Sequence, residues 1–415
     1  MVIAVKRYTK KEHKINLEDI DTDALTVLKT LHAKGFVAYL VGGSVRDLLL
    51  NYTPKDYDIS TNALPEQVKR VFSNCFIVGK RFRLAHVRIN NKIFEVSTFR
   101  KGDNEDASLI HNDNDWGTEE EDVLRRDFTV NGLFYDNETE TIIDYVGGVE
   151  DANKNILSCI GNPYIRFKQD PVRMIRLLKF RARLGLNPEE EMIEALFALR
   201  REILKSSPIR ILEEILRMLE SGSSVAFLKN LQMHGFLETL LPNIAEHFET
   251  PIGNEIYSLL LEVDKSILNE NKTPPNRSIL VACIIFPIFE DHMREFYKAH
   301  PKKAHMGKVQ QEAYNMIQNL FEPTLKITKK ILGETQSIIS MQFKFTPLQK
   351  LKKLVCKIPN TPDFSSALKF FKMRADLEPG LTDIYTEWDY YYQTHKKAIL
   401  KNPEATKPKR GKRHR

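Results

Sequence analysis

The stretch Leu40–Ser60, LVGGSVRDLLLNYTPKDYDIS, decides the fold of this chain. It continues the apolar run Phe36–Val41, a pattern typical of a buried strand, which ends at Gly42–Gly43. Ser44, with Asp47 three residues later, predicts a helix with a start like a capping box. A strand, a glycine turn and a helix together form a phosphate cradle, because the backbone amides of the turn can face an anion.

Two carboxylates, Asp56 and Asp58, close the same stretch. Successive side chains of an extended chain alternate, so both would point to one side. Neighbouring carboxylates repel each other unless a cation lies between them, which predicts a divalent metal site. Glu95 is the candidate third carboxylate of a two-metal site, because a buried glutamate in the strand pattern Ile93–Ser97 needs a partner. The alternatives are an exposed acidic loop for the pair and a solvent-facing strand edge for Glu95.

Composition is ordinary for a globular protein, apart from a basic tail. Of 415 residues, 42% are hydrophobic and 28% are charged, which suits two to four structural units. Residues 401–415 hold seven Lys/Arg and one acid, so +6 of the net charge of +7 lies there. This run predicts a disordered arm for a polyanion, with a solvated terminus as the alternative.

Cysteine usage and hydropathy favour a cytoplasmic protein. The four cysteines are far apart and form no CxxC pair, which argues against structural zinc and a disulfide framework. The first 14 residues lack the apolar core of a signal peptide. The longest apolar run, Ile279–Phe289, contains Pro287 and is too short to span a bilayer.

The order of strand and helix patterns predicts an α+β protein. Strand patterns alternate with helical ones up to about residue 145, and from Asp170 onward helical patterns dominate. We expect five parts: an N-terminal extension with a helix (1–35), a head with a mixed sheet and helices (36–150), a helical neck (151–220), an elongated helical body (221–400) and a basic disordered tail (401–415).

Four motifs follow one another in the first half of the chain. The first combines the glycine turn Gly42–Asp47 with Asp56–Asp58, and the second is Arg125–Leu133, RRDFTVNGL. The third is Asp144–Gly148, DYVGG, and the fourth is Asp170–Arg176, DPVRMIR. In this order they resemble the motifs of class II nucleotidyltransferases, the family of bacterial poly(A) polymerases and CCA-adding tRNA nucleotidyltransferases.

The resemblance covers about residues 36–220 and implies a polymerase-β-like head, a helical neck that carries a nucleotide-reading motif, and helical RNA-binding domains. It implies that Asp56 and Asp58 hold Mg²⁺ or Mn²⁺. The implied catalytic residues are Asp56, Asp58, Glu95 and Asp127. The implied nucleotide-binding residues are Gly42, Gly43, Arg46, Arg126, Asn131, Asp170, Arg173 and Arg176.

The second motif also has a reading from its chemistry. Arg125 and Arg126 place two guanidinium forks beside the carboxylate of Asp127, and such forks suit triphosphate oxygens. Asp127 would orient an arginine or accept from the ribose, and a surface ion pair is the alternative. Asn131 offers a donor and an acceptor, which suits a sugar hydroxyl or the cap of a turn.

The fourth motif combines a helix start with possible base recognition. Asp170 before Pro171 predicts an N-cap followed by N1, and capping alone would explain it. In the family this acid and the first arginine, here Arg173, read the base. Adenine and cytosine both offer an amino donor beside a ring-nitrogen acceptor, which a carboxylate and a guanidinium match. The chain departs from the family at Gln169, where glutamate is usual; an amide accepts from an arginine but adds no charge.

The segment Val78–Val87, VGKRFRLAHV, resembles the poly(A) polymerase branch, whereas CCA-adding enzymes usually carry a less basic sequence there. We expect this cationic loop to bind RNA phosphates, with an ordinary basic hairpin turn as the alternative. The basic tail would add salt-sensitive attachment to the RNA backbone. The expected RNA-binding residues are Lys80, Arg81, Arg83, Lys409, Arg410, Lys412 and Arg413.

These observations together predict a template-independent poly(A) polymerase that transfers AMP from ATP to RNA 3′-hydroxyl ends and releases pyrophosphate by two-metal-ion catalysis. The expected partners are mRNA or small regulatory RNA, with RNA-degradation machinery or an RNA chaperone, and no membrane. The alternative is a CCA-adding enzyme that acts on tRNA. A non-catalytic RNA-binding protein comes third, because the Asp56/Asp58 pair is intact.

Overall fold

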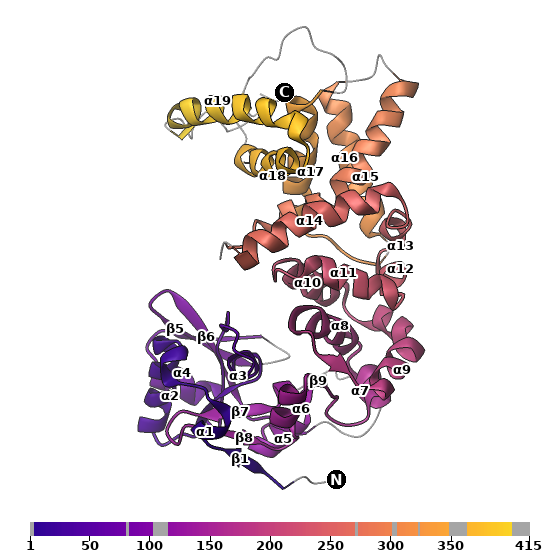
Figure 1. The fold of residues 1–415 in the computed structure, drawn as a ribbon. Helices are drawn as coiled ribbons and strands as arrows, with labels where there is room; N and C mark the ends of the chain where they lie inside the picture. The colour runs from indigo at the N-terminus through magenta and orange to yellow at the C-terminus, as the bar shows by residue number, and fades with distance from the viewer. Residues whose placement is uncertain are drawn as a thin grey trace, which may run out of the picture. The chain divides into compact units, whose positions relative to one another are not determined.

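The structure, a computed structural model, describes residues 4–79, 83–102, 115–269, 273–300, 305–322, 324–347 and 363–400. The chain forms two compact units, Met1–Ser206 and Ser207–Arg415. The first holds a mixed sheet with helices, and the described part of the second is helical, so the predicted fold class is confirmed (Figure 1). Among the described helices, none is long and apolar enough to cross a membrane. The predicted five-part division stays a prediction.

The first unit is built on an eight-stranded sheet with the strand order β1-β8-β7-β2-β3-β6-β5-β4. Neighbouring strands run antiparallel, apart from β3 and β6, which run parallel. The strands are β1 (Lys6–Tyr8), β2 (Ala38–Val41), β3 (Asp58–Thr61), β4 (Cys75–Val78), β5 (Leu84–Ile89), β6 (Lys92–Thr98), β7 (Leu133–Asp136) and β8 (Thr141–Asp144).

The N-terminal segment is more ordered than its polar sequence predicts. Lys6–Tyr8 forms a strand that pairs with β8, and Tyr8 lies opposite Ile142. The polar sequence gives no signal for this strand. The strand is stabilised by pairing with the open edge of β8, and it has no alternating apolar pattern of its own. Helix α1 (Lys10–His13) and the 3₁₀ turn η1 (Leu17–Asp19) follow.

Helices cover the sheet through an apolar core. Val27, Leu28 and Leu31 of α2 are fully buried in one cluster with Leu40 and Ile59 of the sheet, which confirms the helical pattern predicted there. The helices of this part are α2 (Thr22–Ala33), α3 (Gly43–Leu49), α4 (Pro65–Val71), α5 (Glu119–Leu124), the 3₁₀ turn η2 (Thr129–Asn131) and α6 (Gly148–Lys154).

Helices α7 to α9 complete the first unit. The apolar row of Val172, Ile175 and Leu178 on α8 is buried, and the helix ends before Gly185, whose φ of 67° is left-handed. The elements are β9 (Ile156–Leu157), α7 (Pro163–Gln169), α8 (Val172–Leu184), β10 (Asn187–Pro188), α9 (Glu190–Leu199) and η3 (Arg200–Lys205).

The DYVGG turn joins β8 to α6 through one buried carboxylate. Asp144, 1% exposed, accepts from the four successive backbone N–H groups of 146–149 at 2.8–3.1 Å, which satisfies the N-terminal donors of α6. Gly148 lies against η2: a Cβ there would be 2.1 Å from the carbonyl oxygen of Thr129. Glycine is therefore required at this position by the close approach of two backbones.

Aromatic side chains form one core of the second unit. Phe345 lies with ring centroids 4.9 Å from Phe371 and 5.1 Å from Trp388. The elements are α10 (Pro208–Leu219), α11 (Ser224–Met233), α12 (Phe236–Leu240), α13 (Pro242–Ala245), α14 (Pro251–Asn269), α15 (Arg277–Ala299), α16 (Met306–Phe321), α17 (Lys329–Phe345), α18 (Phe364–Leu377), η5 (Pro379–Leu381) and α19 (Thr382–Leu400).

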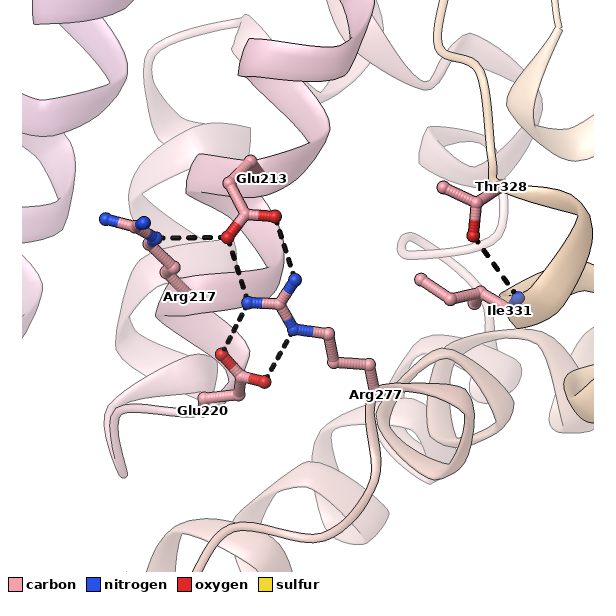
Figure 2. A network of polar contacts seen from close by, with 6 residues as sticks. All are labelled: Glu213, Arg217, Glu220, Arg277, Thr328 and Ile331. Atoms are coloured by element: carbon pink, nitrogen blue, oxygen red, sulfur yellow. Dashed lines mark hydrogen bonds and ion pairs between the residues drawn. The ribbon is translucent and has the colours of Figure 1, made fainter. Parts of the chain in front are cut away.

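Arg277, the first residue of α15, ties this helix to α10 (Figure 2). Its guanidinium donates to Glu220 at 2.7 and 3.1 Å and to Glu213 at 2.8 and 3.0 Å. The hydrogen bonds to Glu220 and Glu213 raise the pKa of Arg277, and those of Arg277 lower the pKa of Glu213. The pair of two-point contacts fixes the angle at which α15 meets α10.

Helix α17 has a side-chain cap: Thr328 Oγ1 accepts a hydrogen bond from the Ile331 N–H (Figure 2).

We expect Gly148→Ala to lower the free energy of unfolding by about 2 kcal/mol or more, because the added methyl group would force η2 and α6 apart. Gly102→Ala is the matched control, since a Cβ there meets nothing within 4 Å, and its effect should stay below about 0.5 kcal/mol. Scanning calorimetry of both variants checks the difference. Equal destabilisation of the two would contradict the close approach.

Candidate functional site

The glycine turn lies between β2 and α3 and touches an arginine of the second motif. Gly42 has φ 63° and ψ −123°, and a Cβ there would lie 3.1 Å from Nη1 of Arg126. Helix α3 begins at Gly43, and Ser44 Oγ donates to the carbonyl of Val41 at 3.0 Å. The predicted capping box at Ser44 is therefore wrong. The sequence rule failed because the acid three residues on is bound by arginines instead.

That acid, Asp47, anchors a buried polar chain. Arg46 donates from Nε and Nη2 to Asp47 Oδ1 at 2.9 and 2.6 Å, and from Nη1 to Asn131 Oδ1 at 2.7 Å. Arg183 of α8 donates to Asp47 Oδ2 at 2.7 Å. Burial lowers the pKa of Arg46, although Asp47 opposes this shift, and the guanidinium also stacks 4.7 Å from the ring centroid of Phe180. The Nε, Nη1 and Nη2 atoms of Arg46 each donate a hydrogen bond within the protein, so Arg46 holds Asp47 and Asn131 in place.

Asp127 continues this chain toward α8. Its Oδ1 accepts from the Phe128 N–H at 2.9 Å and from Asn131 Nδ2 at 3.0 Å, and its Oδ2 lies 2.9 Å from Nη2 of Arg176. Burial alone raises the pKa of Asp127, but Arg176 and Asn131 together hold it below its usual value. Asp127 is therefore an anion that orients Arg176 and Asn131.

Arg126 connects the glycine turn to the sheet. Its Nη2 donates to Asp122 Oδ2 at 2.8 Å and to Ser60 Oγ at 3.2 Å, and its guanidinium lies 5.5 Å from the ring centroid of Phe134. Asp122 and Ser60 were not predicted as site residues. A carboxylate four residues before an arginine, the spacing of an ion pair on a helix, was the available signal for Asp122, although α5 ends before Arg126.

Asp58 and Glu95 are neighbours on parallel strands. The register pairs Ile59 with Val96, so the two carboxylates stand one step earlier on β3 and β6, and both line a hollow of about 220 Å³. Glu95 was predicted to be buried, which is wrong: its side chain is 51% exposed and lies 3.6 Å from His86. The core takes Phe94 and Val96, so strand alternation turns Glu95 to the open face.

Asp56 lies outside that hollow. It precedes β3, which begins at Asp58, and it lines a different hollow of about 690 Å³ together with Asp19 and Lys92. Side chains two residues apart share one side only when both residues lie in the same strand. Asp56 lies before the strand, so alternation does not support the expected shared side for Asp56 and Asp58. Across the residues that the structure describes, no group of three or more His, Cys, Asp or Glu is arranged to hold a metal ion.

A cavity of about 370 Å³ gathers the predicted catalytic and nucleotide-binding residues other than Asp56 and Glu95. It adjoins the hollow of Asp58 and Glu95, because Asp58 and Arg126 line both. The predicted residues that line the cavity are Gly42, Gly43, Arg46, Asp58, Arg126, Asp127, Asn131, Asp170, Arg173 and Arg176.

Helix α8 contributes further lining residues that the sequence reasoning missed. Lys179, Phe180 and Arg183 face the same cavity as Arg173 and Arg176. They continue the spacing of three and four residues along one face of the helix, which was the signal that could have found them. The cationic face of α8 is therefore longer than the family motif.

Asp170 stands at the junction of α7 and α8. It is the C-cap of α7 with φ −143° and ψ 91°, its N–H donates to the Arg166 carbonyl at 3.1 Å, and its carbonyl accepts from the Arg173 N–H at 3.0 Å. The N-cap of α8 is Pro171, one residue later than predicted. The junction places Asp170 at the cavity beside Arg173.

The predicted RNA-binding residues are only partly described. Arg83 is partly exposed, and its Nη2 donates to Glu66 near the start of α4. The other six lie outside the described residues; they are Lys80, Arg81, Lys409, Arg410, Lys412 and Arg413.

Comparisons with known proteins agree with this geometry. Three protein-family profiles match the chain: "Poly A polymerase head domain" over residues 38–158, "Probable RNA and SrmB-binding site of polymerase A" over 185–248 and "Polymerase A arginine-rich C-terminus" over 302–415. The first profile contains the glycine turn, the carboxylates and the RRDFTVNGL motif.

Curated relatives cover most of the chain. Poly(A) polymerase I of Salmonella typhi is 34% identical over 389 residues, which cover 89% of this chain and 81% of the relative. Poly(A) polymerase I of Haemophilus influenzae is 31% identical over 440 residues, covering 99% and 94%. The CCA-adding enzyme of Lactobacillus helveticus is 38% identical over 209 residues, which cover 49% of this chain and 51% of that enzyme.

A solved structure shares the fold. The crystal structure of the Bacillus stearothermophilus CCA-adding enzyme in complex with CTP aligns with a TM-score of 0.62 and 22% identity, over 89% of this chain and 82% of that one. This likeness concerns the fold, whereas the sequence matches establish the family. The chain belongs to the poly(A) polymerase family of nucleotidyltransferases, and it is an enzyme of that class.

Proposed function

We propose that this enzyme is a template-independent poly(A) polymerase, which transfers AMP from ATP to RNA 3′-hydroxyl ends. The observation that carries the proposal is one cavity in which a carboxylate, a glycine turn, several arginines and an acid–arginine pair meet. Asp58 stands at the end of a strand, Gly42 and Gly43 form the turn, and Asp170 with Arg173 lies at the α7–α8 junction.

The acid–arginine pair suits adenine. A carboxylate accepts from the amino group of the base, while a guanidinium donates to the neighbouring ring nitrogen. Uracil and guanine present the reverse order of donor and acceptor, so the pair disfavours them. Arg173 is held by its Nη2, which donates to the carbonyl of Arg125 at 2.9 Å. Such anchoring pre-organises the pair for recognition.

The cationic wall suits the triphosphate. Guanidinium forks bind phosphate oxygens in pairs, and Arg126 and Arg176 present theirs at the cavity. Gly42 allows Arg126 to approach the turn, because any side chain there would meet Nη1. With the triphosphate held, the 3′-oxygen of RNA forms its bond to the α-phosphorus while the bond to pyrophosphate breaks, and the hydroxyl proton passes to water.

The residues fit a divalent metal. Mg²⁺ binds proteins through one or two carboxylates and takes its remaining ligands from phosphates and water, so the absence of a three-residue cluster among the described residues is compatible with it. Asp58 would hold the metal, with Glu95 beside it as support. Asp56 lines a different hollow and would join them only by turning toward Asp58. When bound, two such ions lower the pKa of the 3′-hydroxyl and stabilise the charge that develops on phosphorus.

A CCA-adding tRNA nucleotidyltransferase is the second candidate. The Lactobacillus helveticus enzyme favours it through a match to about half of the chain. The acid–arginine pair would accept cytosine as well as adenine. The poly(A) polymerase relatives support the first proposal over both halves. The choice between the two therefore rests on substrate use.

Purified protein incubated with a short generic RNA should extend it with long tails from ATP and not from CTP, GTP or UTP. Product lengths on a denaturing gel check this outcome. Use of CTP that is confined to tRNA lacking its CCA end would instead establish the second candidate.

Asp58→Ala should reduce nucleotide addition by at least about a thousandfold, equivalent to about 4 kcal/mol, and leave RNA binding within about twofold. The reason is that the carboxylate would support the metal and not the RNA. Asp376→Ala, which removes an exposed carboxylate of the second unit, is the control and should keep full activity. Full activity of Asp58→Ala would refute the metal assignment.

Asp170→Asn should reduce the preference for ATP over GTP and UTP by about tenfold or more, because an amide can donate where the carboxylate only accepts. Single-nucleotide addition with each nucleotide measures the preference as a ratio of kcat/KM values. An unchanged ratio would mean that Asp170 does not read the base.

A further inference from the structure

The turn that carries Arg125 and Arg126 is held from behind by side chains of α7 and α8. Helix α5 ends at Leu124, and the last carbonyl groups of a helix lack partners within it. Arg166 Nη2 donates to the carbonyls of Leu124 and Arg126 at 3.1 and 3.0 Å, and Arg173 Nη2 donates to that of Arg125 at 2.9 Å. Three successive carbonyls are thus bound by two guanidinium groups, which also suit the negative end of the helix dipole.

Gln169 completes this arrangement. Its Oε1 accepts from Arg166 Nη1 at 3.0 Å across one turn of α7. Gln169 is 3% exposed and Arg166 is 7% exposed, and neither lines the cavity that holds Asp170 and Arg173. An accessible nucleotide could reach Asp170 but not Gln169.

We propose that Arg166 and Gln169 are positioning residues for nucleotide binding: they hold the Arg125–Arg126 turn at the cavity and do not read the base. The proposal rests on the proposed function and assigns a role to the residue at which the chain departs from its family. Rotation of the turn would move Arg126 away from Gly42, where its Nη1 lies within 3.1 Å of the Cβ position.

The neutral amide at 169 suits this role. The buried surroundings already contain Arg166, Arg173 and the carboxylate of Asp127, whose pKa is lowered by its arginine neighbours. Position 169 needs an acceptor for one guanidinium N–H, and an amide oxygen provides it without a further buried charge. A side chain of the same size without an acceptor would leave Arg166 Nη1 without this bond and loosen the turn.

The test uses full-length protein and compares four variants. Gln169→Met removes the acceptor at nearly constant volume, Gln169→Glu keeps an acceptor, and Arg166→Lys cannot reach all three oxygens. Asp170→Asn serves as the base-reading comparator. For each variant we would measure kcat and KM for ATP and GTP in single-nucleotide addition, together with the thermal unfolding midpoint.

Gln169→Met and Arg166→Lys should raise KM for ATP about tenfold while kcat changes less than about twofold, because a displaced turn weakens triphosphate binding throughout the reaction. Their ATP-to-GTP ratio of kcat/KM should stay within about twofold of wild type, whereas that of Asp170→Asn should fall about tenfold or more. Gln169→Glu should keep KM for ATP within about twofold of the wild-type value, because it keeps the acceptor. A shifted ratio in Gln169→Met, or an unchanged KM in both loosened variants, would overturn the proposal.

Folding defects and failure of the proposed function give distinct results. If Gln169→Met unfolds, Arg166→Lys and Gln169→Glu decide on the same criteria. If wild type adds CMP to tRNA and not AMP to generic RNA, the proposed function fails, and KM for the accepted nucleotides still tests the positioning role. If wild type adds no nucleotide, the ATP dissociation constant replaces KM, and a value equal to wild type in both loosened variants overturns the proposal.

Discussion

A chain of paired polar and charged side chains, buried except at its two ends, holds the candidate site of the first unit together. It crosses from α8 to α3, to η2 and back to α8, and runs through Arg183, Asp47, Arg46, Asn131, Asp127 and Arg176. Each buried charge in this chain requires its neighbour, because an unpaired ion in a region of low polarity is strongly destabilising. The loss of one member would leave the next without compensation, so the three elements are fixed as a set.

This constraint explains how two distant motifs form one cavity. The carboxylate of Asp58 is positioned by sheet pairing, since Val41 lies opposite it on β2. The arginines of α8 are positioned by a helix whose apolar row is buried. The polar chain sets the separation between these two supports. Under the proposed function, protein groups at fixed positions would select the nucleotide, as a polymerase without a template requires.

Local sequence rules predicted the strands, helices and motif residues better than the long-range side-chain contacts between them. Strand and helix periods gave the sheet and α2, and the motif spacing identified most of the residues that line the cavity. The partners of Asp47 could not be predicted, because Arg183 lies 136 residues away and competes with the local capping geometry. Likewise, the exposure of Glu95 depends on which face of β6 the core occupies, and the strand's own composition does not determine it.

The positive charge of the cavity accounts for affinity for nucleoside triphosphates but not for a choice among their bases. Seven cationic side chains and three carboxylates line it, so the wall has a net positive charge. Such a wall attracts any nucleoside triphosphate, because all of them carry the same phosphates. Discrimination must therefore come from groups that differ in their fit to the bases, and Asp170 with Arg173 is the pair with that chemistry at this wall. The neutral Gln169 fits the same division, because it lies behind the wall and supports a turn that all triphosphates would use.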